Sequence, residues 1–298
     1  MADPPPSVAC VVPARNEAAS LVELHRRFGA ALDERGWSWQ LIIVDDGSTD
    51  DTWEIVSQLA GDDDRVAGIR LQRPSGMLEA LAVGFRAADA DVIAVMDGDL
   101  EARPEDLPAI VSLVLGGVEL ASAARLHHQR PAQRRIASAT LRVVMACTPH
   151  RPADFGAGLK AFHPDLARRV LDDPAAGTGL AFGFSLYRSA QSYAEHVITW
   201  DHQGQPTHFP PRQLASNLAA FSSMALPGPI RAARRAALAV TGATAVAAAA
   251  RRDPRLAAQA GLWGALTLAL RRWEQHGVRP GRPGSTAVTI ERAGFLAR

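Results

Sequence analysis

The first 125 residues alternate between two hydrophobic patterns, and this alternation constrains the fold more than any other feature of the chain. Apolar runs of strand length occur at 8–13, 39–44, 66–71, 92–96 and 118–123. Between them, apolar side chains recur at helical spacing in 17–32, 52–59, 78–87 and 107–115. Strands that are apolar throughout are typical of a parallel sheet covered by helices on both faces. The pattern therefore predicts an α/β fold with a mainly parallel sheet.

Composition excludes several classes of protein. The 298 residues are 47% hydrophobic and carry a formal net charge of +1, so a large core is expected and a nucleic-acid partner is not. Cys10 and Cys147 are the only cysteines, too few for a disulfide framework or a zinc site. Residues 1–6 lack the basic and apolar regions of a signal peptide. We therefore predict a reduced, cytoplasmic setting.

Three acidic turns follow strands of the predicted sheet. They are Pro13–Glu17, Asp45–Asp50 and Asp97–Glu101, after the first, second and fourth strands. Ligands of open α/β sheets bind beyond the carboxyl ends of the strands. We therefore expect the three turns to meet at one ligand site.

The chemistry of the turns indicates a metal and a nucleotide. Asp97 and Asp99, separated by Gly98, can both face one hard cation, and Mg²⁺ or Mn²⁺ would bridge them to a diphosphate. Asp45 and Asp46 can accept an N–H group of a uracil or guanine base. The alternative interpretation is structural, because Asp and Ser residues at strand ends also form turns and cap the next helix.

The three turns resemble the motifs of family 2 glycosyltransferases, as VPARNE at 12–17, VDDGSTDDT at 44–52 and MDGDLE at 96–101. Within that family the chain is most similar to the polyprenyl-phosphate (dolichol- and undecaprenyl-phosphate) sugar transferases. This resemblance is strong over residues 8–165 and weak after them. Further segments that resemble the family are Gly76–Gly84, Ala123–Arg125, Arg134–Ser138, Asp154–Phe162 and Phe221–Pro227.

The resemblance implies a GT-A (nucleotide-diphospho-sugar transferase) fold and an inverting, metal-assisted glycosyltransferase. Its donor would be a UDP- or GDP-sugar, its acceptor a polyprenyl phosphate and its cofactor Mg²⁺ or Mn²⁺. Matched residue by residue, the nucleotide-sugar site would comprise Pro13, Arg15, Glu17, Asp45, Asp46, Gly76, Asp97, Gly98 and Asp99. Asp97 and Asp99 would hold the metal, with Asp99 the more direct ligand. The phosphate and acceptor contacts would be Arg125, Arg134, Lys160 and Arg212.

The mechanism depends on the acceptor. A phosphate monoester is already anionic near neutral pH and needs no protein base. A hydroxyl acceptor needs one, and Asp154 is the candidate, with Asp201 or His202 behind it. The alternative interpretation of Asp154 is a cap or an ion pair in a loop. The family's acceptor-side motif survives only in part at Arg212–Asn217, so the sequence does not identify the acceptor.

We divide the chain into three parts: a catalytic domain at 1–226, an Ala- and Arg-rich helical pair at 227–276 and a loose tail at 277–298. The catalytic domain has a nucleotide-sugar half at about 7–125 and an acceptor half at about 126–226. The uncharged runs 236–250 and 256–270 would each extend about 22 Å as helix, against about 30 Å of hydrocarbon. One hypothesis is a helical pair lying peripherally on the inner leaflet of the cell membrane. The alternative is a soluble hairpin on the catalytic domain, and homo-oligomer formation is left open.

Other functions compete with the leading one. A soluble family 2 glycosyltransferase of secondary metabolism would act on a small-molecule hydroxyl or amine. A non-catalytic nucleotide-binding protein would have no need of three acidic turns. A nucleotidyltransferase usually has a Gly-rich loop with Arg or Lys after its first strand, where this chain has Pro13–Glu17.

Overall fold

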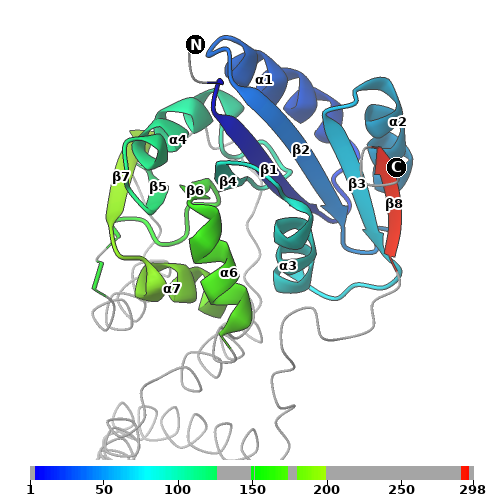
Figure 1. Cartoon of the computed structure of the whole chain (residues 1–298). Coiled ribbons are helices and arrows are strands. Elements are labelled where there is room, and N and C mark those ends of the chain that lie inside the picture. Colours follow the sequence, from blue (N-terminus) through cyan, green and yellow to red (C-terminus); the bar gives the residue numbers. More distant parts are fainter. Residues whose placement is uncertain (1–3, 126–148, 151, 174–179, 199–289, 295–298) are drawn as a thin grey trace, which may run out of the picture. The chain divides into compact units, whose positions relative to one another are not determined.

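The computed structural model describes residues 4–125, 149–150, 152–173, 180–198 and 290–294, all within one compact unit of the chain. Over residues 4–125 strands and helices alternate as the sequence predicts, whereas the elements described after residue 125 were not predicted (Figure 1). In chain order they are β1 (Ser7–Ala14), α1 (Leu21–Asp33), β2 (Ser38–Asp45), α2 (Thr52–Asp62), β3 (Val66–Leu71), α3 (Met77–Ala87), β4 (Val92–Val95), the 3₁₀ helix η1 (Pro104–Asp106), α4 (Leu107–Leu115), β5 (Leu120–Arg125), β6 (Lys160–Phe162), α6 (Pro164–Asp172), α7 (Leu180–Ser189), β7 (Tyr193–Ile198) and β8 (Ile290–Gly294).

The described strands form one eight-stranded sheet in the order β7-β5-β6-β4-β1-β2-β3-β8. Strands β4, β1, β2 and β3 run parallel to one another, and β7 runs parallel to β5. Strand β6 pairs antiparallel with both β4 and β5 and so joins the two parallel groups. The prediction of a mainly parallel sheet is confirmed. The sequence did not predict β6, because three residues are too few to show a period.

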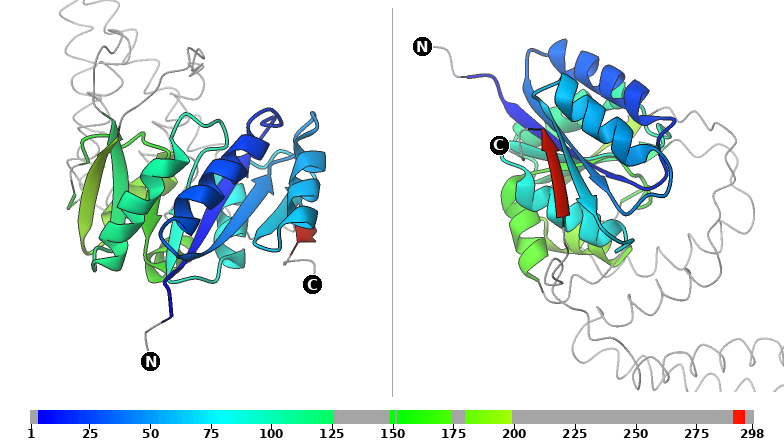
Figure 2. Two further views of the ribbon diagram at one scale, coloured as in Figure 1. Left: turned by 90° about the horizontal axis from the view of Figure 1, so that it is seen from above. Right: turned by 90° about the vertical axis from the view of Figure 1, so that its right-hand side faces the viewer.

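Helices cover both faces of the sheet (Figure 2). In β1, Val8, Cys10 and Val12 belong to the core that α1, α2 and α4 cover. The opposite face meets α3, where a Cβ at Gly84 would lie 2.3 Å from Val11 Cγ1, so glycine permits the close approach of helix and sheet. All the side chains of β1 from Val8 to Val12 are fully buried. Burial on both faces explains why these strands are apolar without alternation.

The first helix begins later than the sequence predicts, and the difference affects the turn that precedes it. The helix expected over 17–32 begins only at Leu21. Asn16 adopts a left-handed conformation, with φ of 58°, and the Glu17 N–H donates to the Thr52 hydroxyl at 3.0 Å. Residues between β1 and α1 therefore form a turn that is hydrogen-bonded to the start of α2. The fifth strand also lies two residues later than expected, at Leu120–Arg125.

Within the predicted loose tail at 277–298, residues Ile290–Gly294 form β8, a strand that the sequence did not predict. This strand pairs antiparallel with β3, from Ala67 opposite Gly294 to Leu71 opposite Ile290. It covers the edge of β3, whose backbone groups would otherwise be open to another chain.

Several predictions lie outside the described residues. They are the helical pair at 227–276 and the assignments of Arg134, Asp201, His202 and Arg212. In the part of the chain that the structure describes, no helix has both the length and the apolar character of a membrane span.

Candidate functional site

The three acidic turns lie at the same edge of the sheet. Strands β4, β1 and β2 are neighbours and run in the same direction, so their carboxyl ends meet there. Ala14 of β1 lies opposite Asp45 of β2, and Val11 of β1 opposite Val95 of β4. The register therefore brings together the turns that begin after these residues.

The first and second turns are joined by hydrogen bonds. The Asn16 N–H donates to Ser48 Oγ at 3.0 Å, and the Asn16 side-chain oxygen accepts the N–H of Thr49 at 2.9 Å. Within the second turn Asp50 Oδ1 accepts the Thr52 N–H at 3.1 Å, whereas Asp51, at the cap position of α2, makes no side-chain cap hydrogen bond. The first turn, which carries Arg15 and Glu17, is thus held against the start of α2, and Pro13 lies within β1, opposite Val44.

Asp45 and Asp46 are both buried but differ in their contacts. Asp45 Oδ1 accepts the Ser48 N–H at 2.8 Å, whereas its Oδ2 has no hydrogen-bond donor among the described residues and lies 3.4 Å from Arg70 Nε. Both oxygens of Asp46 accept backbone N–H groups, from Ser75 at 2.6 Å and Gly76 at 2.9 Å. Asp46 therefore fixes the turn that carries Gly76, whose φ is 93°.

The third turn brings further negative charge to the first. A Cβ at Gly98 would lie 3.4 Å from Glu17 Cγ, so the two turns are in contact. Burial and the neighbouring charges of Asp99 and Asp97 raise the pKa of Glu17 to about 7. Burial and the charge of Asp99 likewise raise the pKa of Asp97, against the opposing effect of Lys160 and Arg125. Glu17 and Asp97, whose pKa values are raised beside the Asp99 carboxylate, thus form a site that favours a cation.

The donor set fits a divalent cation that shares its coordination with a ligand. No group of three or more His, Cys, Asp or Glu side chains is arranged to hold a metal within the described ranges. Asp97 and Asp99 supply carboxylate oxygens only, the ligands that Mg²⁺ and Mn²⁺ prefer. Mg²⁺ typically keeps waters and substrate phosphates besides one or two carboxylates. The pair therefore suits a metal that is completed by a diphosphate.

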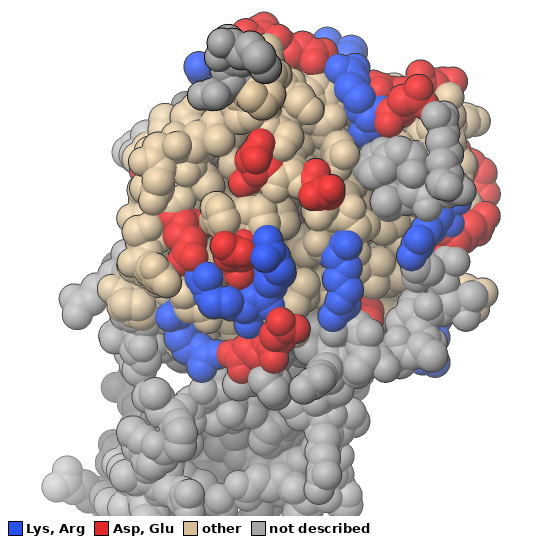
Figure 3. Space-filling model, viewed as in Figure 1, with Lys and Arg blue, Asp and Glu red and all other residues tan. Residues whose placement is uncertain are grey.

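A basic group lies on the other side of Asp97. Arg125 ends β5, and Lys160 in β6 lies opposite Val95 of β4 and Ser122 of β5. Burial lowers the pKa of Lys160 to about 8, although Asp97 and Asp154 act in the opposite direction. On the face shown in Figure 3, acidic and basic side chains lie next to each other rather than in a patch of one sign.

Asp154 forms an ion pair in a loop, which is the alternative interpretation that the sequence allowed. The guanidinium of Arg125 binds both carboxylate oxygens, with Nε on Oδ2 and Nη2 on Oδ1, the latter at 2.9 Å. The Asp154 side chain is only 3% exposed. Its assignment as a general base stays a prediction, and the structure adds that Arg125 holds its ionised form.

Two residues of this region were not identified from the sequence. A Cβ at Gly158 would lie 1.9 Å from Asp97 Oδ2, so the Asp97 carboxylate occupies space that only glycine leaves open. Glu195 of β7 accepts the Ala153 N–H at 2.8 Å. Gly158 could have been found as a glycine within the family-like segment after Asp154, but Glu195 has no local signal.

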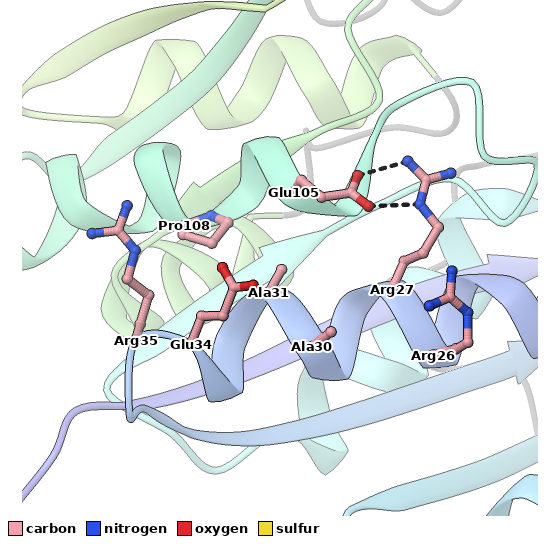
Figure 4. Close-up of a pocket in the computed structure, with 8 residues that line it drawn as sticks. All are labelled: Arg26, Arg27, Ala30, Ala31, Glu34, Arg35, Glu105 and Pro108. Carbon is pink, nitrogen blue, oxygen red and sulfur yellow. Dashed lines mark hydrogen bonds and ion pairs between the residues drawn. The ribbon is translucent and has the colours of Figure 1, made fainter.

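A groove of about 220 Å³ lies elsewhere, between α1 and the η1–α4 segment. Figure 4 shows Arg27 of α1 directed at Glu105 of η1, which it binds at 2.6 Å. Arg26, Arg35 and Glu34 also line this groove, which therefore has mixed charge. None of the strand-end carboxylates Glu17, Asp97 and Asp99 is among its lining residues.

Comparison with known proteins finds similar sequences. Residues 9–145 match the sequence model described as glycosyl transferase family 2. The chain is 32% identical over 173 residues to an undecaprenyl-phosphate 4-deoxy-4-formamido-L-arabinose transferase of Pectobacterium carotovorum subsp. carotovorum (strain PC1), covering 57% of this chain and 53% of that protein. It is 34% identical over 167 residues to a protein of the same name from Shewanella sediminis (strain HAW-EB3), covering 55% and 50%. The chain thus spans about half the length of these curated relatives.

A solved structure is similar in fold. Glucosyl-3-phosphoglycerate synthase from Mycobacterium tuberculosis, crystallised with Mn²⁺, UDP and glucosyl-3-phosphoglycerate, aligns with a TM-score of 0.55. The alignment covers 74% of this chain and 80% of that one, at 20% identity. The predicted GT-A fold is confirmed. The match to the family 2 glycosyltransferase model covers a little under half of the chain.

Proposed function

We propose that this protein transfers a sugar, with inversion, from a UDP- or GDP-sugar to a polyprenyl phosphate, assisted by Mg²⁺ or Mn²⁺. The observation that carries the proposal is the meeting of Glu17, Asp97 and Asp99 at the carboxyl ends of neighbouring strands, where burial and the charge of Asp99 raise the pKa of both Glu17 and Asp97. These carboxylates would bind the metal of a metal-bound diphosphate, and the basic side chains Arg125 and Lys160 would contact its phosphate groups.

The donor would be bound by the three turns together. Glu17 and the Asp45 carboxylate would receive the nucleoside, while Asp46 holds the Gly76 turn in place. Asp97 and Asp99 would hold the cation, with Asp99 the more exposed of the two and therefore the more accessible ligand. The bound cation would neutralise the diphosphate that leaves with the nucleoside.

Transfer then consists of one displacement. An oxygen of the acceptor phosphate forms a bond to the anomeric carbon, and the bond from that carbon to the donor's β-phosphate oxygen breaks. The nucleoside diphosphate leaves with the electron pair, and the configuration at carbon is inverted. A phosphate monoester is largely a dianion above its second pKa of about 6, so no proton has to be removed. Arg125 and Lys160 would orient the phosphate groups, since Arg offers a bidentate fork.

Two observations support a phosphate acceptor. The curated relatives at 32% and 34% identity are named as undecaprenyl-phosphate transferases. Asp154, the candidate base, is bound through both oxygens by Arg125, which stabilises its ionised form and lowers its ability to take a proton. Because polyprenyl phosphates reside in membranes, we also propose that the protein works peripherally at the cytoplasmic face of the cell membrane.

The alternative is a family 2 enzyme that glycosylates a small-molecule hydroxyl or amine. That reaction would need Asp154 as general base and would therefore need Arg125 to release it during turnover.

The experiment is a transfer assay with a panel of radiolabelled UDP- and GDP-sugars, Mn²⁺ and either undecaprenyl phosphate in detergent or a set of hydroxyl acceptors that includes 3-phosphoglycerate. Label in the organic phase, dependent on undecaprenyl phosphate, is the expected result. Label only in water-soluble products would replace the proposal by the alternative. Asp99→Asn serves as the inactive control.

A further inference from the structure

We propose that Glu195 of the edge strand β7 is a positioning residue that acts through Asp154 to orient Arg125 toward the acidic turn after β4. The inference rests on the proposed function, in which Arg125 contacts a phosphate group. It assigns a role to a strand that the sequence did not associate with the site.

The ion pair between Arg125 and Asp154 sets the orientation of the Arg125 side chain. Arg125 is the last residue of β5, and its side chain is 22% exposed. Asp97 and Glu101 of the third acidic turn both interact electrostatically with its guanidinium. A Cβ at Gly156 would lie 3.2 Å from Arg125 Nη2, so the guanidinium packs over that glycine. With Asp154 on one side and Gly156 beneath it, the fork of Arg125 has one well-defined orientation.

Glu195 supports the backbone that carries Asp154. Its Oε1 accepts two N–H groups, from Ala153 at 2.8 Å and from Asp154 at 3.4 Å. Glu195 lies opposite Ser122 in the pairing of β7 with β5. The loop at 153–154 is therefore fastened to β7, one strand beyond the β5 strand that ends in Arg125. A hydrogen bond to a charged acceptor is stronger than one between neutral groups, and two such bonds can hold a short loop.

Aromatic packing holds the other end of this loop. The rings of Phe155 and Tyr187 lie 5.5 Å apart, and those of Tyr187 and Tyr193 lie 5.1 Å apart. The Tyr193 hydroxyl is 2.8 Å from Ser122 Oγ. Phe155 is thus fixed in a buried layer beneath the sheet edge, and Glu195 fixes the two residues before it. Replacing Glu195 would remove the hydrogen bonds to Ala153 and Asp154 but keep the aromatic packing of Phe155. The expected effect is therefore a shift of Asp154 rather than unfolding.

The variants separate positioning from stability. Glu195→Ala removes the acceptor and should lower kcat/KM by about 10-fold, the size of a typical effect from a residue that orients a direct ligand. Glu195→Gln keeps an acceptor oxygen and should restore activity close to that of the unchanged protein. Glu119→Ala is the matched control, because Glu119 also accepts a backbone N–H, from Gln191 at 2.7 Å, and pairs with Arg169. Its loss should lower stability but leave kcat/KM unchanged.

A double-mutant cycle with Asp154→Asn tests whether Glu195 acts through Asp154. If it does, the double variant is no slower than Asp154→Asn alone, whereas additive losses would overturn the proposal. Equal losses in Glu195→Ala and Glu119→Ala would also overturn it, since they would show a general effect of stability. If Glu195→Ala does not fold, Glu195→Asp, which shortens the reach, replaces it in the cycle.

A crystal structure of the Glu195→Ala variant gives a result that does not depend on activity. Displacement of Arg125 from Asp154, or of Asp154 from its position, is expected, and an unchanged pair would overturn the inference. Absence of transfer by the unchanged protein, in contrast, would refute the proposed function and leave this structural result interpretable.

Discussion

Replacing Gly158 by alanine should disable the site while leaving the fold nearly intact. The added Cβ would lie 1.9 Å from Asp97 Oδ2 and 2.6 Å from Asp97 Cγ, where carbon atoms in proteins need at least 3.0 Å. The carboxylate must therefore move by about 1 Å or more, and a displacement of that size at a reacting centre can reduce the rate about 100-fold. The obstructing atoms are the end of one side chain, so the free energy of unfolding should fall by only about 1–2 kcal/mol.

The assay compares kcat/KM for the donor with the free energy of unfolding in urea, for the unchanged protein, Gly158→Ala and Gly61→Ala. Gly61 lies in α2, where an added Cβ would have no atom within 4 Å. Alanine there should stabilise the protein by about 0.5–1 kcal/mol without changing turnover. A Gly158→Ala variant that is folded and retains a third or more of the original kcat/KM would refute the role given to the Asp97 carboxylate.

Three further predictions concern single carboxylates. Burial and like charges raise the pKa of Glu17 to about 7. The contribution of Glu17 to stability is therefore present below pH 4.5 and lost as the pH rises through 7. Glu17→Gln should be about 1–2 kcal/mol more stable than the unchanged protein at pH 8, after allowance for solvent screening, and equal to it in stability at pH 4. Equal urea midpoints at pH 8 would contradict this. The hydrogen bonds from Arg65 hold the pKa of Asp63 below its ordinary value, so the stabilisation is present at neutral pH and lost as the pH falls. Asp63→Asn should lower the free energy of unfolding by about 1 kcal/mol at pH 7 and by less at pH 3. An unchanged free energy of unfolding at pH 7 would contradict this role of Asp63. Asp99→Ala should abolish transfer and keep the circular dichroism spectrum and melting temperature, whereas metal-dependent turnover in this variant would refute its assignment.

The sequence predicts the elements that depend on local pattern. Strand β3 and helix α4 lie where expected, because each combines a continuous hydrophobic pattern with clear ends. The turns after β1, β2 and β4 were expected at one edge because parallel strands place their carboxyl ends together. Features that depend on local period and on the direction of parallel strands are thus predictable from the sequence alone.

Several of the unpredicted features depend on contacts between distant residues. Strand β6 has three residues, and β8 pairs with β3 across more than 200 positions of the chain. Glu195 meets Ala153 across 42 positions, and Asp46 meets the Gly76 turn across 30. None of these pairings changes the local hydrophobic pattern, so no inspection of a single sequence would reveal them.

In the proposed function the acidic turns hold a metal together with a nucleoside diphosphate. Calorimetric titration of UDP and of GDP, with and without Mn²⁺, tests it in the unchanged protein and in the Asp97→Asn/Asp99→Asn double variant. We predict that Mn²⁺ tightens the binding of at least one nucleotide by about 10-fold or more, and that the double variant loses this coupling. Binding that is the same with and without Mn²⁺, or coupling that persists in the double variant, would show that these carboxylates do not hold a metal together with the nucleotide.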